Sequence, residues 1–249
     1  MKYARFCLAD KTAYGVVEDD QIREITGTPL SDYRDAGVSH HMESVRLLAP
    51  VPRPGKILAM ALNYRSHVGS AKEPKRPEPF YKTPSSVIGP GDAIVIPEGT
   101  TRVDAEGELV AVIGSQARNV KEEEALDHVL GFTCGNDVSA RDWQREDVQW
   151  WRAKSSDTFA PIGPVIVTDL EPASLEIVVR LNGDTVQRCD SSEMIFNVSH
   201  TIAHVSKYVT LEPGDLLFTG TSGTTAQINP GDTVEVAISN IGALSNVVQ

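Results

Sequence analysis

Two glutamates, Glu106 and Glu108, stand one residue apart at the start of an apolar run that continues to Ile113. Because side chains alternate along a strand, both carboxylates are expected to share a face with Val110 and Val112. Partly desolvated and side by side, they would repel each other and take up protons unless a cation sat between them. An oxygen-ligated divalent metal would remove that cost, with a third acid supplied from elsewhere in the chain.

Asp137 is the candidate for that third ligand, because it lies in a polar turn between an apolar strand over residues 129–134 and the start of a helix. Each signal also has a plainer interpretation when taken alone. Glu106 and Glu108 could lie on a solvated edge strand, and Asp137 could be a helix cap or a turn residue. The metal site is therefore a hypothesis that depends on the three acids together.

His67 is the histidine best placed to act as a base. It directly follows an apolar strand over residues 56–62, at the root of a charged, proline-rich stretch that ends at Phe80. A loop of this kind can close over a ligand and bring a histidine at its root to the substrate. His40 and His41, by contrast, are expected in a surface loop.

His200 and His204 are four residues apart, a spacing that can chelate zinc on a helix. The residue after His200 is Thr201, however, so the glutamate of the zinc-protease motif is missing. These two histidines are therefore interpreted as part of an exposed helix face.

Three further polar residues, taken one by one, have the character of surface residues: Lys154, Arg141 and Gln144. Arg141 and Gln144 would present their polar ends on one side of a helix. Beside a metal, the three would form a pocket for the carboxylate of a substrate, and the hydroxyl of Thr221, which closes an apolar strand, could also reach it.

The composition excludes several classes of function. The chain has 249 residues, 41% of them hydrophobic, and its 23 Lys and Arg against 34 Asp and Glu leave a net charge of −11. That balance argues against a nucleic-acid or membrane partner, because phosphate surfaces reward clustered cations. Three cysteines without a C-x-x-C pair predict neither a disulfide framework nor a thiolate zinc site. With no long apolar run, the sequence predicts a cytoplasmic protein.

A small β domain is expected over residues 1–53 and the main domain over residues 54–249. Short alternating runs at residues 3–9, 12–18 and 21–25 are typical of strands, and Val51-Pro52-Arg53-Pro54-Gly55 is typical of a linker. Pro-Gly-Asp occurs three times, beginning at Pro90, Pro213 and Pro230, and fits type II turns between strands.

The main domain is expected to be mainly β (α+β), with few peripheral helices. Apolar runs bounded by Gly, Pro or Asp predict strands at residues 56–62, 86–89, 93–97, 108–114, 164–168, 176–183, 216–220 and 233–238. Helices are predicted over residues 121–130, 141–151 and 194–208.

Seven short motifs, in order, resemble those of the fumarylacetoacetate hydrolase family over about four-fifths of the chain. They are Asn63-Tyr64-x-x-His67, Phe80-x-Lys82-x-Pro84-Ser85-Ser86, Gly89-Pro90-Gly91-Asp92, Glu106-Gly107-Glu108-Leu109, Gly135-Asn136-Asp137-Val138-Ser139-Ala140-Arg141-Asp142-x-Gln144, Lys154-Ser155-x-Asp157-Thr158, and Leu211-Glu212-Pro213-Gly214-Asp215 with Thr219-Gly220-Thr221.

The resemblance implies a mixed β-roll core behind a small N-terminal domain, and a homodimer. It also implies Mg²⁺ or Mn²⁺, with Ca²⁺ as a further candidate, held by the acids already named. The resemblance also implies which residues surround a 2-oxo or diketo acid substrate. His67 and Lys154 are implied as catalytic residues. The implied substrate-binding residues are Arg141, Gln144, Thr221 and Tyr64.

The activity implied first is metal-dependent C–C hydrolysis of a small diketo acid through an enolate. The alternatives are decarboxylation or enol–keto tautomerisation of a 2-oxo acid at the same site. Hydrolytic members carry a glutamate three residues after the histidine, where this chain has Ser70, and Glu73 is a candidate substitute as catalytic residue. That departure favours decarboxylation or tautomerisation. An alternative of another class is a non-catalytic β module that binds a divalent ion.

Overall fold

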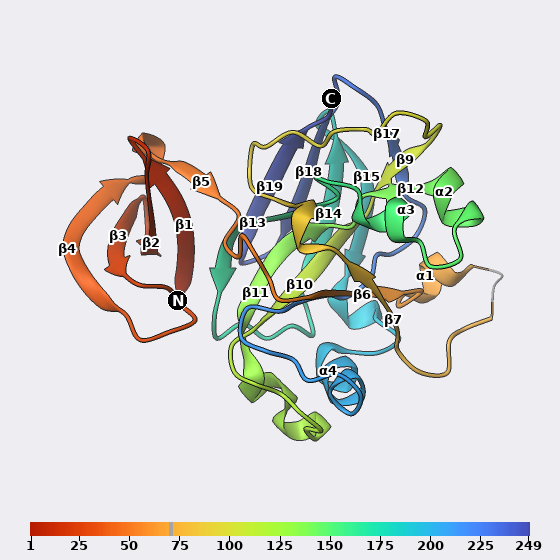
Figure 1. Ribbon diagram of the computed structural model, residues 1–249, viewed down its shortest axis with the longest axis horizontal. Coiled ribbons are helices and arrows are strands. Elements are labelled where there is room, and N and C mark those ends of the chain that lie inside the picture. The colour runs from red at the N-terminus through yellow and green to blue at the C-terminus, as the bar shows by residue number, and fades with distance from the viewer. Residues whose placement is uncertain (70–71) are drawn as a thin grey trace.

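The computed structural model describes residues 1–69 and 72–249, and most of the regular structure is β (Figure 1). Ser70, which bears on the choice between hydrolysis and its alternatives, lies outside the described residues. The strands are β1 (Lys2–Leu8), β2 (Lys11–Glu18), β3 (Gln21–Thr26), β4 (Arg34–His41), β5 (Arg46–Leu48), β6 (Ile57–Ala61), β7 (Glu78–Lys82), β8 (Val87–Ile88), β9 (Val103–Ala105), β10 (Gly107–Ile113), β11 (Val129–Asn136), β12 (Ser139–Ala140), β13 (Ala160–Val167), β14 (Glu176–Leu181), β15 (Asp184–Asp190), β16 (Leu216–Phe218), β17 (Ala226–Ile228), β18 (Thr233–Ile238) and β19 (Gly242–Val247).

The helices are short and lie at the periphery, as expected. The α-helices are α1 (Arg65–Val68), α2 (Arg141–Glu146), α3 (Trp151–Ser155) and α4 (Val198–Ser206), and the 3₁₀ helices are η1 (Met42–Ser44), η2 (Pro84–Ser86), η3 (Glu122–His128) and η4 (Ser191–Glu193). No helix in residues 1–69 and 72–249 is long and apolar enough to cross a membrane.

The N-terminal strands form an antiparallel meander that stands apart from the main body at the left of Figure 1. Ala9 and Asp10, between β1 and β2, both have positive φ (44° and 68°), which matches the twist that a two-residue hairpin turn requires. The prediction of a surface loop for His40 and His41 is wrong, because both lie in β4 and pair with β3. Strand β4 lies at the edge of the sheet and has an exposed face, so its sequence is rich in polar residues. A polar sequence of this kind is also typical of a loop, which is why the prediction failed.

The main sheet is mixed and includes the N-terminal strands. Among the described residues its order is β4-β3-β2-β1-β13-β11-β10-β16-β6-β7, with β16 parallel to β6 and most other neighbours antiparallel. Strands β5 and β8 join the same sheet beside β1 and β13, and a four-stranded sheet, β15-β14-β18-β19, and a three-stranded sheet, β12-β9-β17, hold the remaining strands. The contact between the N-terminal lobe and the main body runs through β1 and β13, where Lys2 pairs with Val167 and Tyr3 with Ile166.

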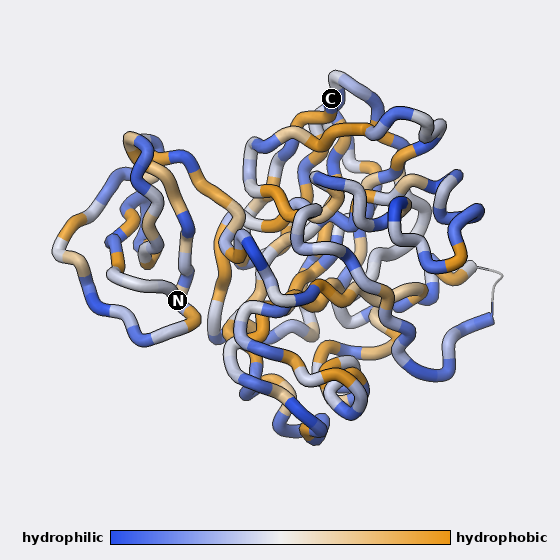
Figure 2. Tube along the Cα trace, viewed as in Figure 1, coloured by the Kyte–Doolittle hydropathy of each residue, from blue (hydrophilic) through white to orange (hydrophobic). Residues whose placement is uncertain are grey.

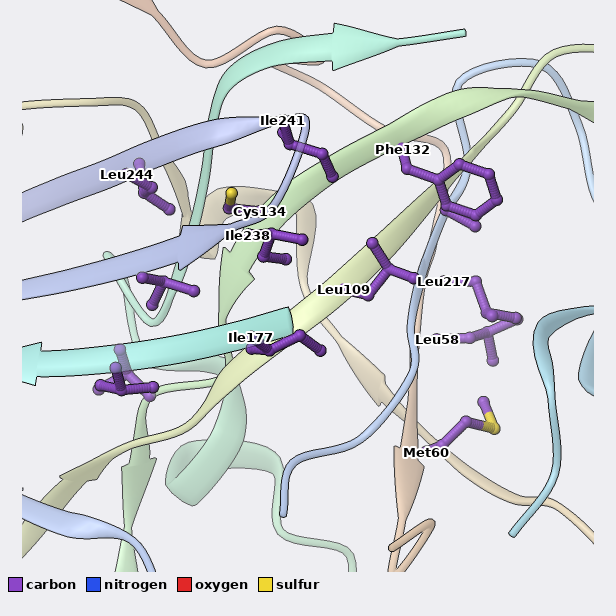
Figure 3. Close-up of a cluster of buried hydrophobic side chains, with 14 of the residues drawn as sticks. Leu58, Met60, Leu109, Phe132, Cys134, Ile177, Leu217, Ile238, Ile241 and Leu244 are labelled. Atoms are coloured by element: carbon purple, nitrogen blue, oxygen red, sulfur yellow. The ribbon is translucent and has the colours of Figure 1, made fainter. Parts of the chain in front are cut away.

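The core lies between these sheets, where the hydrophobic residues collect in Figure 2. Figure 3 shows side chains from β6, β10, β11 and β16 meeting those of β14, β18 and β19, among them Leu58, Leu109, Ile177, Leu217 and Ile238. Strand β10 is buried along its whole length, so both of its faces are covered. A strand of this kind gives polar side chains at its end a fixed position in a dry environment.

The three Pro-Gly-Asp turns are built alike. Gly91, Gly214 and Gly231 have φ of 76°, 87° and 96°, the conformation that the third position of a type II turn requires. In each turn the Asp N–H donates to the carbonyl three residues earlier, at 3.0–3.3 Å. The Asp carboxylate in turn accepts the N–H of that earlier residue, at 2.7–2.9 Å. The predicted turns are therefore present.

Four predicted elements differ from the structure. The helix expected over residues 141–151 is two helices, because Trp150 adopts a left-handed conformation (φ 57°) that an α-helix cannot contain. The helix over 121–130 is the 3₁₀ helix η3, and that over 194–208 begins only at Val198, behind the cap Asn197. The strand expected over 93–97 is reduced to a single bridge between Ile94 and Val248.

Candidate functional site

Three buried carboxylates meet at the end of β10. Oxygen atoms of Glu106, Glu108 and Asp137 all lie within 4.8 Å of one another. Their residues are 3%, 1% and 1% exposed, so the alternative of a solvated edge strand is wrong. The register of β10 and β11 brings them together: Glu108 pairs with Gly135, and the Asp137 N–H donates to the Glu106 carbonyl at 2.9 Å.

Gly107, between the two glutamates, is required by the opposite face of the strand. A Cβ at this position would lie 2.3 Å from Cγ2 of Val179 in β14, closer than two carbon atoms can approach. The second sheet therefore packs directly on the backbone at Gly107. With that face closed, Glu106 and Glu108 are held on the other face, toward the pocket.

Two lysines neutralise part of this cluster. Lys154, in α3, places its Nζ 2.6 Å from an oxygen of Glu106, 2.6 Å from one of Asp137 and 2.6 Å from the Ser139 hydroxyl. Lys82, at the end of β7, donates to Asp137 at 2.5 Å and to the Lys154 carbonyl, and its side chain is fully buried. Lys82 belongs to one of the sequence motifs, but the sequence alone predicted no role for it. Its position at the end of a strand close to the predicted site is the feature that could have identified it as a site residue.

Arg141 connects the cluster to a second buried acid. Its guanidinium donates to Asp104 at 3.0 Å, to Glu106 at 2.5 Å and to the side-chain oxygen of Gln144 at 2.9 Å. Thr225 also donates to Asp104, at 2.7 Å. Asp104 was missed from the sequence, where it precedes Glu106 by two residues and would share its face.

The electrostatics separate the two glutamates. Burial raises the pKa of Glu106, but the adjacent Lys154 and Arg141 outweigh burial and hold that pKa well below its usual range. Burial together with the nearby Asp137 and Glu106 raises the pKa of Glu108 well above its usual range. Lys154 has its pKa raised, because its two carboxylate partners outweigh burial.

A divalent cation fits this donor set. Glu108 receives a hydrogen bond from the Gly220 N–H at 2.7 Å but forms no ion pair with any residue in 1–69 and 72–249, whereas Glu106 and Asp137 pair with buried lysines. Three carboxylates without sulfur or imidazole among them are the ligands that Mg²⁺, Mn²⁺ and Ca²⁺ prefer. A cation beside Glu108 would supply the charge that makes its ionised form favourable.

A cavity of about 50 Å³ opens onto the acids. One wall is polar and the other is apolar, and the lining residues are Met60, Ala61, Leu62, His67, Phe80, Glu106, Glu108, Asp137, Gln144, Trp150, Lys154 and Thr221. The cavity therefore joins the predicted His67, Lys154, Gln144 and Thr221 to the acid cluster. Arg141 contributes through its bonds to Glu106 and Gln144.

The geometry of His67 identifies its protonated nitrogen. Nδ1 lies 2.7 Å from the Gly223 carbonyl, and a carbonyl can only accept, so Nδ1 carries the hydrogen. Nε2 lies 4.0 Å from Oε1 of Glu106, on the side of the acids. In the neutral ring, Nε2 is thus the basic nitrogen, and it faces the site.

Residues 219–223 hold both sides of the site in place. The Gly220 N–H bonds Glu108, and the Gly223 carbonyl accepts from His67. Thr221 donates to the Gly107 carbonyl at 3.1 Å and accepts from Gln187 of β15 at 2.9 Å. The position of His67 relative to the acids is therefore set by this one segment.

Besides Arg141, two predicted site residues do not line the cavity. Tyr64 is fully buried outside the cavity lining, and burial raises the pKa of its hydroxyl far above the usual range. Glu73 pairs with Arg65 at 2.8 Å, with its side chain 47% exposed. His200, interpreted as a surface residue, pairs with Glu122 on an exposed face of α4.

Known proteins are similar to this chain in sequence and fold. A family description named fumarylacetoacetate (FAA) hydrolase C-terminal matches residues 56–249, and one named Rv2993c-like, N-terminal, matches residues 1–50. The oxaloacetate tautomerase fahd2 of Xenopus laevis, a mitochondrial protein, is 43% identical over 219 residues, which cover 82% of this chain and 69% of the relative.

Two crystal structures extend the comparison over the whole chain. The 5-carboxymethyl-2-hydroxymuconate delta-isomerase of Mycobacterium smegmatis has a TM-score of 0.94 at 39% identity, covering 100% of this chain and 99% of the other. The maleylpyruvate hydrolase of Sphingobium sp. SYK-6, in complex with manganese(II) and pyruvate, has a TM-score of 0.83 at 29% identity, covering 100% and 98%. With these matches and the buried acid cluster together, the chain belongs to the fumarylacetoacetate hydrolase family of enzymes.

Proposed function

We propose that this protein is a divalent-metal-dependent tautomerase that interconverts the enol and keto forms of a small 2-oxo diacid such as oxaloacetate. The observation that carries the proposal is the environment of His67. Its Nδ1–H is bonded to a backbone carbonyl, so the ring turns its basic Nε2 toward the acids. Such a histidine suits the transfer of one proton, which is all that tautomerisation requires.

Glu106, Glu108 and Asp137 would hold the metal, with Mg²⁺ or Mn²⁺ as the proposed ion and Ca²⁺ as a further candidate. When bound, the cation supplies positive charge that favours the enolate form of a 2-oxo acid. The Lys154 ammonium, at 2.6 Å from both Glu106 and Asp137, fixes the orientation of two ligands and adds positive charge at the cavity wall.

The other residues bind and orient the substrate. Gln144 and Thr221 line the cavity and offer an amide and a hydroxyl to a carboxylate, while Arg141 holds the Gln144 oxygen and so turns its N–H₂ outward. Arg141 and Tyr64, expected from the sequence to bind substrate, lie outside the cavity lining, and we propose them instead as positioning residues. In the enol-to-keto direction, His67 Nε2 accepts the enol hydroxyl proton, and the protonated ring then donates that proton to the adjacent carbon.

C–C hydrolysis of an acylpyruvate, the activity expected first from the sequence, is the second candidate. The maleylpyruvate hydrolase neighbour, whose structure holds pyruvate, favours it. Hydrolysis also needs a group to activate water, and Glu73, the substitute considered for that role, is paired with Arg65 on an exposed surface. This difference, together with the tautomerase and isomerase names of the more similar relatives, supports the proposal of tautomerisation over hydrolysis.

The test is to offer enol oxaloacetate and acetylpyruvate separately, with Mg²⁺, and to follow enol absorbance and product release. We expect enol loss faster than in buffer, abolished by Glu108→Gln and lowered about 100-fold by His67→Ala. Glu73→Gln serves as the control and should retain the wild-type rate. Acetate and pyruvate formed from acetylpyruvate at the faster rate, or full turnover by His67→Ala, would reject the proposal. Release of carbon dioxide would instead identify a decarboxylase.

Three further expectations remain proposals. We propose a homodimer, tested by light scattering for twice the mass of the chain, and a cytoplasmic location, tested by cell fractionation. The boundary between domains at residues 53 and 54 is supported by the two family matches, which end at residue 50 and begin at residue 56.

A further inference from the structure

Two aromatic rings form the apolar wall of the cavity. Phe80 of β7 and Trp150, just before α3, pack edge to face, with ring centroids 5.5 Å apart and planes at 72°. Both rings line the cavity that opens onto the acid cluster. The pair joins two segments that lie 70 residues apart in the sequence, and its geometry is the one that aromatic quadrupoles favour.

A much larger groove lies on the other side of the same pair. Its volume is about 520 Å³, against about 50 Å³ for the cavity. Its lining is largely apolar and consists of Pro79, Phe80, Tyr81, Lys82, Thr83, Val148, Gln149, Trp150, Trp151 and Ser155. Since Phe80 and Trp150 line both spaces, they separate the site from the groove.

The backbone of Trp150 adopts a conformation that is energetically unfavourable for an aromatic residue. Its φ of 57° and ψ of 17° are left-handed, which an aromatic residue rarely adopts. Its carbonyl accepts the Lys154 N–H at 2.9 Å, so the same residue begins the turn that carries the site lysine. Backbone strain of this kind persists where the surrounding structure maintains it, and it is concentrated at functional sites.

We propose that the Phe80–Trp150 pair determines specificity by limiting substrates to short 2-oxo acids, and that removing the indole joins the cavity to the outer groove. The inference rests on the proposed function in one respect, that a 2-oxo acid binds at the acids. A cavity of about 50 Å³ has room for only a few water-sized groups. A ligand with an apolar end would need the groove, whose walls include the exposed Tyr81, Val148 and Trp151.

The test variant is Trp150→Gly, because glycine adopts the left-handed conformation freely and retains the carbonyl that Lys154 needs. The matched control is Trp151→Gly, which removes the adjacent indole from the groove, 69% exposed and outside the cavity lining. The ligands are oxalate, which is short, and phenylpyruvate, which carries an apolar ring on a 2-oxo acid. Binding is measured by calorimetry with Mg²⁺ present.

We expect the wild type and the Trp151→Gly control to bind oxalate and to discriminate against phenylpyruvate. Trp150→Gly should improve phenylpyruvate binding relative to oxalate by about tenfold or more, the size of effect that pocket shape produces. An unchanged ratio in a folded Trp150→Gly protein would overturn the inference. If that variant does not fold, Trp150→Asn, which also tolerates the left-handed region, is judged by the same ratio.

The two proposals fail in different ways. Wild-type protein that binds Mg²⁺ but no oxalate would count against the proposed function, because a 2-oxo acid site must accept a small dicarboxylate. Wild-type protein that binds phenylpyruvate and oxalate with equal affinity would contradict the proposed role of the Phe80–Trp150 pair, and it would leave the proposed function standing. A gain of phenylpyruvate binding in Trp151→Gly equal to that in Trp150→Gly would likewise reject the wall.

Discussion

Lys82 shows how strongly single charges act inside this site. Its side chain is fully buried between Asp137 and the Lys154 carbonyl, where burial lowers the pKa of its ammonium and the adjacent Asp137 carboxylate opposes that shift. Removing one member of a buried pair leaves the other charge without compensation, at a cost of several kcal/mol. A divalent cation is the other species that can supply that charge.

We therefore predict that Lys82→Met lowers the free energy of unfolding by about 3 kcal/mol in the presence of a chelator. The same variant should bind Mn²⁺ more tightly, by a factor on the order of ten, because one competing positive charge is gone. Urea titration and metal titration measure the two effects. Lys56→Met is the control, since Lys56 pairs with Asp215 outside the site and should lose stability with unchanged metal affinity. Weaker metal binding by Lys82→Met would show that the lysine mainly orients Asp137.

Asp142 provides a prediction about pH. Burial raises its pKa, but hydrogen bonds from Thr100 and Thr101 outweigh burial and lower the pKa to about 2. The hydroxyl of Thr100 donates at 2.6 Å and the N–H of Thr101 at 2.8 Å, which attaches α2 to the segment before β9. A lowered pKa in the folded state means that the unfolded chain binds the proton more readily, so the stabilisation is complete above pH 3.8 and is lost as the pH falls toward 2.

Asp142→Asn should accordingly lose about 1 kcal/mol at neutral pH, a value reduced for the partial solvent exposure of the carboxylate. The difference in unfolding free energy between wild type and variant should shrink as the pH falls from about 4 to about 2. Urea titrations across that interval measure it. A difference that stays constant with pH would mean that the charge of Asp142 contributes nothing.

At the scale of elements, the segment from Thr219 to Gly223 controls the site through its backbone. Gly220 has φ of 93°, and a Cβ there would lie 2.8 Å from Cβ of Asn63 and 3.2 Å from the Met60 carbonyl. Its N–H is the donor to Glu108. The glycine is thus required both by its conformation and by the close approach of β6.

Gly220→Ala should destabilise the protein by about 3 kcal/mol, because left-handed strain and crowding add. It should also weaken metal binding, as Glu108 loses its donor. Gly231→Ala is the matched control, with φ of 96° and no atom within 4 Å of the added Cβ. We expect it to cost about 1 kcal/mol and to leave metal binding intact. Thermal unfolding and Mn²⁺ titration distinguish the two, and equal losses in both variants would contradict a role for crowding.

The elements also show where local patterns failed. Residues 141–151 have helical composition, yet Trp150 turns left-handed where it packs against Phe80. Residues 93–97 have β-branched residues, yet Ile94 finds only one bridge partner, Val248, near the end of the chain. Both outcomes depend on a distant partner, which local propensity does not include.

At the scale of the whole molecule, the N-terminal lobe shares its core with the main body. Phe6 and Ile22 belong to the same buried cluster as Leu109 and Ile177, and β1 continues the main sheet beside β13. If the main body unfolds, the buried side chains of the N-terminal lobe lose the apolar surface against which they pack. The proposed boundary at residues 53 and 54 would then separate two domains that are coupled in stability.

We predict that the full chain unfolds in urea with coincident transitions by tryptophan fluorescence and far-ultraviolet circular dichroism. The three tryptophans, Trp143, Trp150 and Trp151, all lie in α2, in α3 or at the start of α3, so fluorescence reports on the main body alone. Circular dichroism reports on all strands, including β1–β4. Separate transitions would show that residues 1–53 unfold on their own.

Features that depend on near neighbours in the chain follow from the sequence alone. Alternation along a strand placed Glu106 and Glu108 on one face, and the three Pro-Gly-Asp turns follow from the fixed φ of proline and the freedom of glycine. The order of the motifs led to the family and to its mainly β fold. These are local properties, and the residues that carry them are adjacent in the chain.

Which distant residues complete the site depends on how the sheets and loops come together. Lys82 and Asp104 join the acids, Tyr64 is buried outside the cavity lining, and the Gly223 carbonyl determines the protonated nitrogen of His67. Each of these outcomes depends on the pairing of strands and loops far apart in sequence. A local pattern cannot contain them, because the desolvation and close packing that give them their effect arise only when the sheets come together.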